Sequence, residues 1–204
     1  MGFETPITVK KAINEILANK YVLPAIQREF VWSAEQIENL FDSLMRGYPI
    51  GSFLFWKVHP NKISEFQFYR FMDHYDERDY THHKPINLPM NHEVIAILDG
   101  QQRLTALYIG LLGWYTDKLP YFRWDNPKAF PKRVLHINLR RPLSEDGSAP
   151  NGFELKFLKE SDQKQHLTDK FWFKVGDILN FTNVTEVVNF CVKNNLLSNQ
   201  DTYL

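Results

Sequence analysis

The sequence predicts an α+β fold, in which helices pack against a small sheet within one domain spanning residues 1–204. Segments with apolar residues at helical spacing are interspersed with short segments rich in aromatic and β-branched residues, which are typical of strands. Hydrophobic residues make up 44% of the 204 residues, which supplies enough apolar surface for one sizeable core. No internal repeat or low-complexity tract is found, so a repeat architecture is excluded.

Four segments are predicted as helices. Residues 8–19 carry a candidate N-cap, Thr8, followed by apolar residues on one face. A second helix starts at Ser33 with a capping box, because Gln36 follows three residues later, and it ends at Gly47. Apolar residues at helical spacing predict the other two helices, at residues 104–112 with a first turn at 99–103, and at residues 185–194.

Strands are predicted where short aromatic or apolar runs lie between turn residues. These runs are residues 52–58, 66–71, 94–98, 134–139 and 153–158. Residues 21–32 contain Pro24 and no clear period, so they are expected to be an extended segment or a loop. Residues 73–91 are a long polar connection, and residues 171–175 are ambiguous. The last two strands flank a polar loop at 144–152 and could form a wide hairpin.

Composition excludes several classes of protein. Lys plus Arg and Asp plus Glu each number 24, and the resulting net charge of +0 argues against nucleic-acid binding through bulk positive charge. The single cysteine, Cys191, excludes an internal disulfide, and the N-terminus lacks the pattern of a secretory signal. No apolar run approaches the roughly 20 residues that span a bilayer. We therefore expect a soluble, cytoplasmic protein with no membrane partner.

The neutral total conceals one basic segment. Residues 118–141 contain seven basic residues and one acidic residue, interleaved with Tyr121, Phe122, Trp124 and Phe130. This composition is typical of a surface that contacts phosphates and stacks bases. The alternative is a solvated loop whose aromatic residues belong to the core. The candidate nucleic-acid contacts are Arg123, Lys128, Lys132 and Arg133.

Residues 99–103, with the sequence Asp-Gly-Gln-Gln-Arg, carry the clearest chemical signal. A buried strand meets a helix here, so the first N–H groups of the helix are free donors at the positive end of its dipole. Gly100 permits close approach to the backbone, and Arg103 offers paired donors to phosphate oxygens. The amides of Gln101 and Gln102 can orient a ligand or a water molecule. This pattern is suited to binding a phosphate group.

Asp99 leaves two interpretations open. Its carboxylate would take the free N–H groups and repel an anion unless a divalent cation such as Mg²⁺ lay between them. Alternatively, Asp99 only caps the helix while Arg103 and the two glutamines point to solvent. A second group of similar chemistry, Gln27 and Arg28 near Trp32, favours a binding site if the two groups converge in the fold.

Three segments, in this order, resemble the N-terminal domain of GmrSD-type, modification-dependent restriction systems, a family of the ParB/sulfiredoxin-like nuclease superfamily. They are residues 26–32, residues 42–44 with 47–51, and residues 98–105. The Asp-Gly-Gln-Gln-Arg motif is the most specific of them. The resemblance covers about the first half of the chain, and the part after Trp114 is similar only in general character.

The resemblance implies a ParB/sulfiredoxin-like α+β domain with a small mixed sheet that binds a nucleoside triphosphate. In characterised relatives, hydrolysis of this nucleotide regulates DNA cleavage in defence against phage. Family members usually continue into a helical region and often a His-Asn-His-type nuclease domain, so we expect the chain to stop before that region. The implied nucleotide site consists of Gln27, Arg28, Tyr48, Pro49, Ile50, Gly51, Asp99, Gly100, Gln101, Gln102 and Arg103.

The leading hypothesis is a nucleotide-binding and nucleotide-hydrolysing sensor domain. In it, Arg28 and Arg103 bind phosphates, Asp99 holds Mg²⁺, and Gln101 or Gln102 positions the attacking water. The alternative is a module that binds modified DNA through residues 118–141 without turning over a nucleotide.

Other chemistries have less support in the sequence. There is no Gly-x-x-x-x-Gly-Lys-Ser/Thr loop, which excludes a Walker-type NTPase. A nuclease acting alone is disfavoured because Asp99 has no second carboxylate or histidine at a clear spacing. His74, Asp76, His82 and His83 lie in a polar loop without the spacing of metal ligands.

Overall fold

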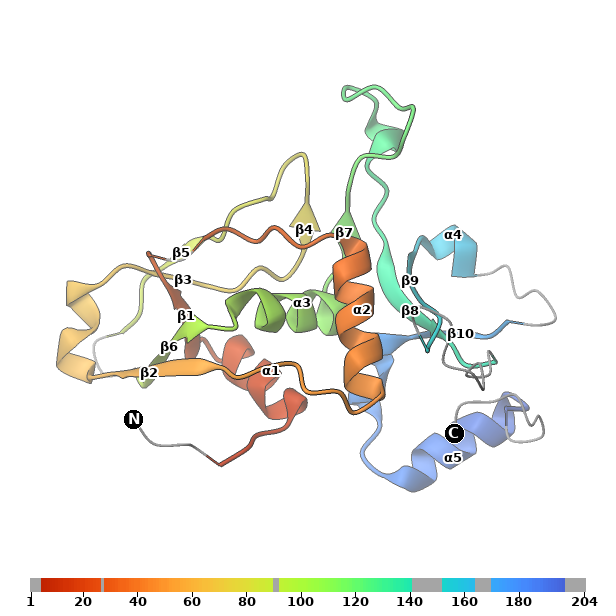
Figure 1. Ribbon diagram of the computed structural model, residues 1–204, viewed down its shortest axis with the longest axis horizontal. Coiled ribbons are helices and arrows are strands. Elements are labelled where there is room, and N and C mark those ends of the chain that lie inside the picture. Colours follow the sequence, from red (N-terminus) through yellow and green to blue (C-terminus); the bar gives the residue numbers. More distant parts are fainter. Residues whose placement is uncertain (1–4, 27, 90–91, 141–151, 164–169, 197–204) are drawn as a thin grey trace.

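A mixed five-stranded sheet forms the centre of the computed structural model, which describes residues 5–26, 28–89, 92–140, 152–163 and 170–196 (Figure 1). The strand order is β2-β6-β1-β3-β5. β6 pairs with β1 in parallel, and the other neighbouring pairs are antiparallel. These strands are β1 (Tyr21–Pro24), β2 (Leu54–Val58), β3 (Phe68–Tyr69), β5 (Pro85–Ile86) and β6 (Val94–Asp99). The predicted α+β fold with a small mixed sheet is confirmed.

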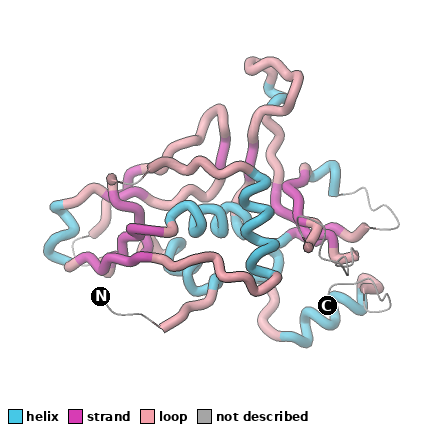
Figure 2. The backbone as a smooth tube through the Cα atoms, viewed as in Figure 1, coloured by secondary structure: helices cyan, strands magenta, loops and turns pink. Residues whose placement is uncertain are grey.

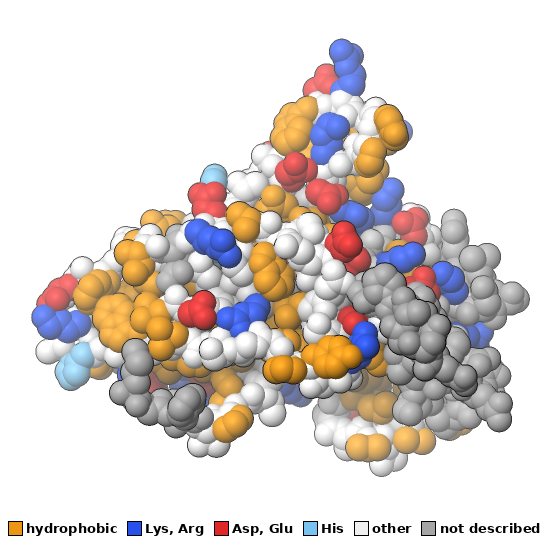
Figure 3. Space-filling model, in the orientation of Figure 1, with side chains coloured by type: hydrophobic (Ala, Val, Ile, Leu, Met, Phe, Trp, Pro, Cys, Tyr) orange, Lys and Arg blue, Asp and Glu red, His pale blue; other side chains and the backbone are white. Residues whose placement is uncertain are grey.

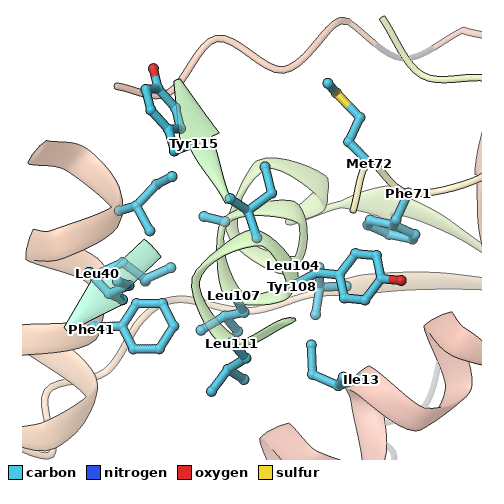
Figure 4. Packing of buried hydrophobic residues seen from close by; sticks show 14 of the residues in the cluster. Ile13, Leu40, Phe41, Phe71, Met72, Leu104, Leu107, Tyr108, Leu111 and Tyr115 are labelled. Atoms are coloured by element: carbon cyan, nitrogen blue, oxygen red, sulfur yellow. The ribbon is translucent and has the colours of Figure 1, made fainter. Parts of the chain in front are cut away.

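One helix, α3 (Gln101–Leu112), lies at the centre of the hydrophobic core. Ten of its 12 residues are buried, and α1 (Val9–Leu17) and α2 (Ala34–Met45) contact it. Figure 4 shows leucine side chains of α3 pointing toward aromatic and aliphatic side chains from the surrounding elements. A Cβ atom at Gly110 would overlap the ring of Phe41 on α2, so the glycine permits this close approach. The first turn of α3 is therefore held by packing along the rest of the helix.

A second, antiparallel sheet has the strand order β10-β8-β9 and lies on the far side of α2 from the main sheet (Figure 1). Its strands are β8 (Val134–Asn138), β9 (Leu155–Leu158) and β10 (Trp172–Lys174). The pairing of β8 with β9 confirms the predicted hairpin, although residues 141–151 of its loop lie outside the described residues. The β10 strand resolves the ambiguity over residues 171–175.

The remaining elements are short. β4 (Tyr75–Asp76) and β7 (Tyr115–Thr116) pair in parallel, and α4 (Glu160–Gln163) and α5 (Val184–Lys193) complete the described helices. Single 3₁₀ turns follow β2, precede β8 and follow β10. No helix in the described ranges is long and apolar enough to cross a membrane.

Residues 117–133 form a protrusion from the body of the domain. The chain leaves β7, passes through one 3₁₀ turn (Pro127–Ala129) and returns to β8, and most of this path is loop (Figures 1 and 2). The protrusion contains the greater part of the basic segment.

Candidate functional site

The junction between β6 and α3 has the geometry that the motif predicts. Gly100 is the N-cap of α3 and has a left-handed backbone with φ of +88°. A Cβ atom at this position would overlap the ring of Phe53, so a side chain is excluded both by the backbone and by the packing. No side chain among the described residues caps α3. The N–H groups of its first turn therefore have no side-chain acceptor among the described residues.

Asp99 does not cap this helix. Its carboxylate is 67% exposed, and its Oδ2 lies 3.4 Å from Nη2 of Arg103. The interpretation of Asp99 as a simple helix cap is wrong, because the left-handed turn at Gly100 intervenes between the carboxylate and the helix. Asp99 instead presents an exposed carboxylate beside the free N–H groups.

Arg103 is held rigidly by the connection between α2 and β2. Its Nη1 donates to the carbonyl of Ile50 at 2.6 Å, and its Nη2 donates to the carbonyl of Ser52 at 2.7 Å. The guanidinium also lies 4.6 Å from the ring centre of Phe53. A guanidinium has five N–H groups, so two remain beyond these bonds and the bond to Asp99. Arg103 is thus a fixed cation with donors to spare.

Gly51 makes this position of Arg103 possible. Its backbone is left-handed, with φ of +87°, and an added Cβ atom would lie 2.5 Å from Nη1 of Arg103. Pro49 and Ile50 precede it in the same turn. The side chain of Tyr48 is exposed, and its hydroxyl accepts a hydrogen bond from Arg46 at 2.8 Å.

The two glutamines connect α3 to residues 28–31. Nε2 of Gln102 donates to the carbonyl of Glu29 at 2.8 Å, and its Oε1 accepts from the N–H of Val31 at 3.1 Å. Nε2 of Gln101 donates to the carbonyl of Arg28 at 3.1 Å. These contacts bring the first motif segment against the first turn of α3. Gln27 lies outside the described residues.

Only one of the glutamines keeps an unused polar atom. Both ends of the Gln102 amide are hydrogen-bonded, whereas Oε1 of Gln101 is buried and has no hydrogen-bond partner among the described residues. Exchanging the O and N atoms of the Gln101 amide would place its oxygen against the carbonyl of Arg28, so the orientation is set by that carbonyl. Gln101 therefore offers a free acceptor next to the helix N-terminus.

An open depression of about 340 Å³ adjoins the junction. It lies between α2 and the turn at residues 47–52, and Arg103 forms part of its wall. We call it the α2 depression. Its lining includes Trp32, Gln36, Asn39, Ser43, Ile50 and Arg103.

Comparison with known proteins identifies the family. Residues 9–202 match the family described as the GmrSD restriction endonuclease, N-terminal domain. The chain belongs to this family. It is also 34% identical over 138 residues to an uncharacterized protein of the archaeon Methanocaldococcus jannaschii. The match covers 68% of this chain and 20% of that relative, so the matched part of the chain spans about a fifth of the relative's length.

In this GmrSD domain, the predicted DNA-binding residues differ in their surroundings. Arg123 and Lys128 are exposed on the protrusion. Arg133 is mostly buried and pairs with Asp117, and Nζ of Lys132 lies 4.4 Å from the ring centre of Trp114. Lys132 is exposed as well, so Arg123 and Lys128 differ from it only in having no ring contact or ion pair among the described residues.

We call residues 74–83, which include His74, Asp76, His82 and His83, the histidine loop. Within the described ranges, no group of three or more His, Cys, Asp and Glu side chains could hold a metal ion. His82 instead pairs with Glu29, with 2.5 Å between Nδ1 and Oε1. Burial lowers the pKa of the neighbouring His83 to about 4, although Glu29 partly opposes this shift. The histidine loop thus packs beside the residues that the glutamines contact.

Sequence reasoning missed the polar face of α2. Gln36, Asn39 and Ser43 follow one another at spacings of three and four residues, so one face of the helix carries all three. The spacing of these polar residues was the signal that could have revealed the α2 depression.

Proposed function

We propose that this GmrSD domain binds a nucleoside triphosphate with Mg²⁺ at the β6–α3 junction and hydrolyses it. The observation that carries the proposal is the uncapped N-terminus of α3 beside a fixed Arg103. Free N–H groups at a helix N-terminus and a preorganised guanidinium are both donors that phosphate oxygens accept. The domain would then resemble the ParB-like nucleotide-binding domains in its fold as well as in its site.

Arg28 supplies a second cation for the phosphates. Its side chain is exposed, and its carbonyl accepts from Gln101 at the first turn of α3. The carboxylate of Asp99, at the end of β6 just before this turn, is also exposed. Proteins commonly bind Mg²⁺ through one or two carboxylates together with substrate phosphates, so a single Asp fits this role. Bound there, Mg²⁺ would neutralise charge that develops on the phosphates.

We propose that Oε1 of Gln101, which is buried and has no partner among the described residues, accepts a hydrogen bond from an attacking water that enters with the nucleotide. Of the two glutamines proposed for this role, only Gln101 has the capacity, because both ends of the Gln102 amide are already hydrogen-bonded. We therefore assign water positioning to Gln101 and a structural role to Gln102.

In the whole protein, nucleotide turnover would regulate cleavage of modified DNA. We propose that a His-Asn-His-type nuclease domain, either in the rest of a longer chain or in a separate protein, performs the cleavage. The family described for residues 9–202 is that of a restriction endonuclease, which supports DNA as the final target.

Thermal-shift measurements with ATP, GTP, CTP and UTP, each with and without Mg²⁺, test the binding. At a hundredfold excess over Kd, a ligand adds about 2.7 kcal/mol of stability, which raises Tm by roughly 5–10 °C. Arg28→Ala should abolish the shift and preserve the Tm of the free protein, because the side chain is exposed. Arg123→Ala, which removes the same charge on the protrusion, is the control. An absent shift with every nucleotide would refute the proposal.

DNA binding by the protrusion, without nucleotide turnover, is the second candidate. Tyr121 is fully exposed and has a left-handed backbone with φ of +65°, and Trp124 is 52% exposed. Orange and blue side chains, with red ones between them, lie on the protrusion in Figure 3. Exposed aromatic rings beside Arg123 and Lys128 can stack on bases while the cations contact phosphates. A fall in DNA affinity with added salt, unaffected by nucleotides, would favour this candidate.

A further inference from the structure

The α2 depression is a second binding surface that borders the β6–α3 junction. Arg103 belongs to both places, because its Nη2 lies 3.4 Å from Asp99 and its side chain lines the depression. We propose that this depression binds the nucleobase of the nucleotide whose phosphates lie at the N-terminus of α3. This inference rests on the proposed function and adds to it the residues that distinguish one base from another.

The path of residues 28–32 links the two places. Arg28 and Glu29 contact Gln101 and Gln102 through their carbonyls, and Trp32 lies in the wall of the depression. Four residues in extended form cover at most about 14 Å. One small ligand can therefore contact the first turn of α3 and the depression together.

The lining of the depression suits a flat, uncharged and polar group. Trp32, Leu40 and Ile50 contribute apolar surface, and Trp32 offers an aromatic ring for stacking. Arg103 is its single charged lining residue. The surface beside α2 on the side of β2 is mainly white and orange in Figure 3, which agrees with this low charge. The depression therefore offers few charged groups to pair with a second phosphate group or with a charged peptide.

Unused hydrogen-bonding groups line the same depression. The side-chain amide of Asn39 forms no hydrogen bond with a described residue, so it offers a donor and an acceptor side by side. Gln36 uses its Oε1 to accept from the N–H of Ser33 at 2.9 Å, which leaves its NH₂ group as a donor. Oγ of Ser43 donates to the carbonyl of Asn39 at 2.8 Å and keeps acceptor capacity. Paired donors and acceptors of this kind match the edges of nucleobases.

Calorimetry with inorganic tripolyphosphate and with each of the four nucleoside triphosphates tests the inference. The base site predicts that the preferred nucleotide binds more tightly than tripolyphosphate. Asn39→Ala should weaken that nucleotide about tenfold and reduce the preference among the four bases, because a bidentate amide contact carries about that much discrimination. Its affinity for tripolyphosphate should stay unchanged. Asn14→Ala makes the same chemical change on the exposed surface of α1 and should alter neither affinity.

A second variant tests whether the volume of the α2 depression is needed for binding the base. Asn39→Leu fills the depression with an apolar side chain and should abolish the advantage of the nucleotide over tripolyphosphate. If nucleotides bind and Asn39→Ala retains the wild-type preference, the base site is overturned and the phosphate site stands. If tripolyphosphate binds as tightly as every nucleotide, the base site is also overturned. If neither class of ligand binds, the proposed nucleotide function fails together with the base site.

Discussion

Replacing Gln102 by Met should destabilise the domain by about 2–4 kcal/mol, because two hydrogen bonds that join α3 to residues 29–31 are lost. The side chain of Gln102 is buried, and Met has a similar length, so packing changes little. The carbonyl of Glu29 and the N–H of Val31 would each lose a partner. A partly buried group left unpaired costs about 1–3 kcal/mol, and partial access to water favours the lower half of this range.

Thermal unfolding gives the measurement. For a domain of about 200 residues, this loss corresponds to a fall in Tm of roughly 5–15 °C. Gln36→Met is the matched control, since that side chain accepts one hydrogen bond at an exposed helix start and its loss should cost about 1 kcal/mol or less. Equal and small effects of the two substitutions would refute the argument that Gln102 joins the motif segments.

A charged variant adds a pH test of the same contact. Gln102→Glu places a carboxylate against the carbonyl of Glu29, which accepts a hydrogen bond in the wild type. Burial and this carbonyl should raise the pKa of the introduced carboxyl above its unfolded value of about 4.3. The variant should therefore be least stable near pH 7 and recover relative to the wild type as the pH falls and the carboxyl becomes a donor. A deficit independent of pH would contradict this reasoning.

Three further predictions concern Gly51, His83 and the exposed cations of the protrusion. Gly51→Ala should weaken nucleotide binding, measured by calorimetry, more than Gly47→Ala does. Both glycines have a left-handed backbone, but only a Cβ atom at Gly51 would displace the guanidinium of Arg103. The domain should lose about 2–3 kcal/mol of stability as pH falls from 6.5 to 4. Over this range His83 is protonated in the unfolded chain, whereas the buried side chain in the folded domain stays neutral until about pH 4. Denaturant titrations should show a weaker pH dependence for His83→Asn. Arg123→Ala and Lys128→Ala should each reduce the slope of log affinity for DNA against log salt by about 1, and an unchanged slope would exclude the protrusion as the contact.

Local signals in the sequence predicted the starts of α1 and α2 correctly. Thr8 accepts a hydrogen bond from the N–H of Lys11 at 3.2 Å, and the capping box of Ser33 and Gln36 is complete. These signals are reliable because a cap is formed by residues three apart in the chain. The strand β1 was harder to recognise. Its four residues are buried on both faces between β6 and β3, so they show no alternation, and Pro24 ends the strand.

The contacts of the site residues could not be derived from local signals. The amides of Gln101 and Gln102 reach residues 71–73 positions earlier in the chain, and Arg103 reaches carbonyls 51–53 positions earlier. The sequence indicated which residue types would gather at the strand–helix junction. The long-range packing of residues 28–31, 50–52 and 101–103 decides which of these polar atoms form hydrogen bonds with the main chain.

These contacts change how substitutions in the motif are to be interpreted. The side chains of Gln102 and Arg103 hold the segments that flank the first turn of α3, and no described side chain caps the N–H groups of that turn. Arg103→Ala would therefore release the turn at residues 50–52 and also remove a cation, so a loss of binding would not separate the two effects. Gly51→Ala retains the charge of Arg103 but displaces its guanidinium. Arg28→Ala removes an exposed charge and leaves the turn at residues 50–52 intact. If Arg28→Ala abolishes nucleotide binding at unchanged Tm, the phosphates are bound by charge beside α3, and the role of Arg103 as a fixed cation can then be measured through Gly51→Ala.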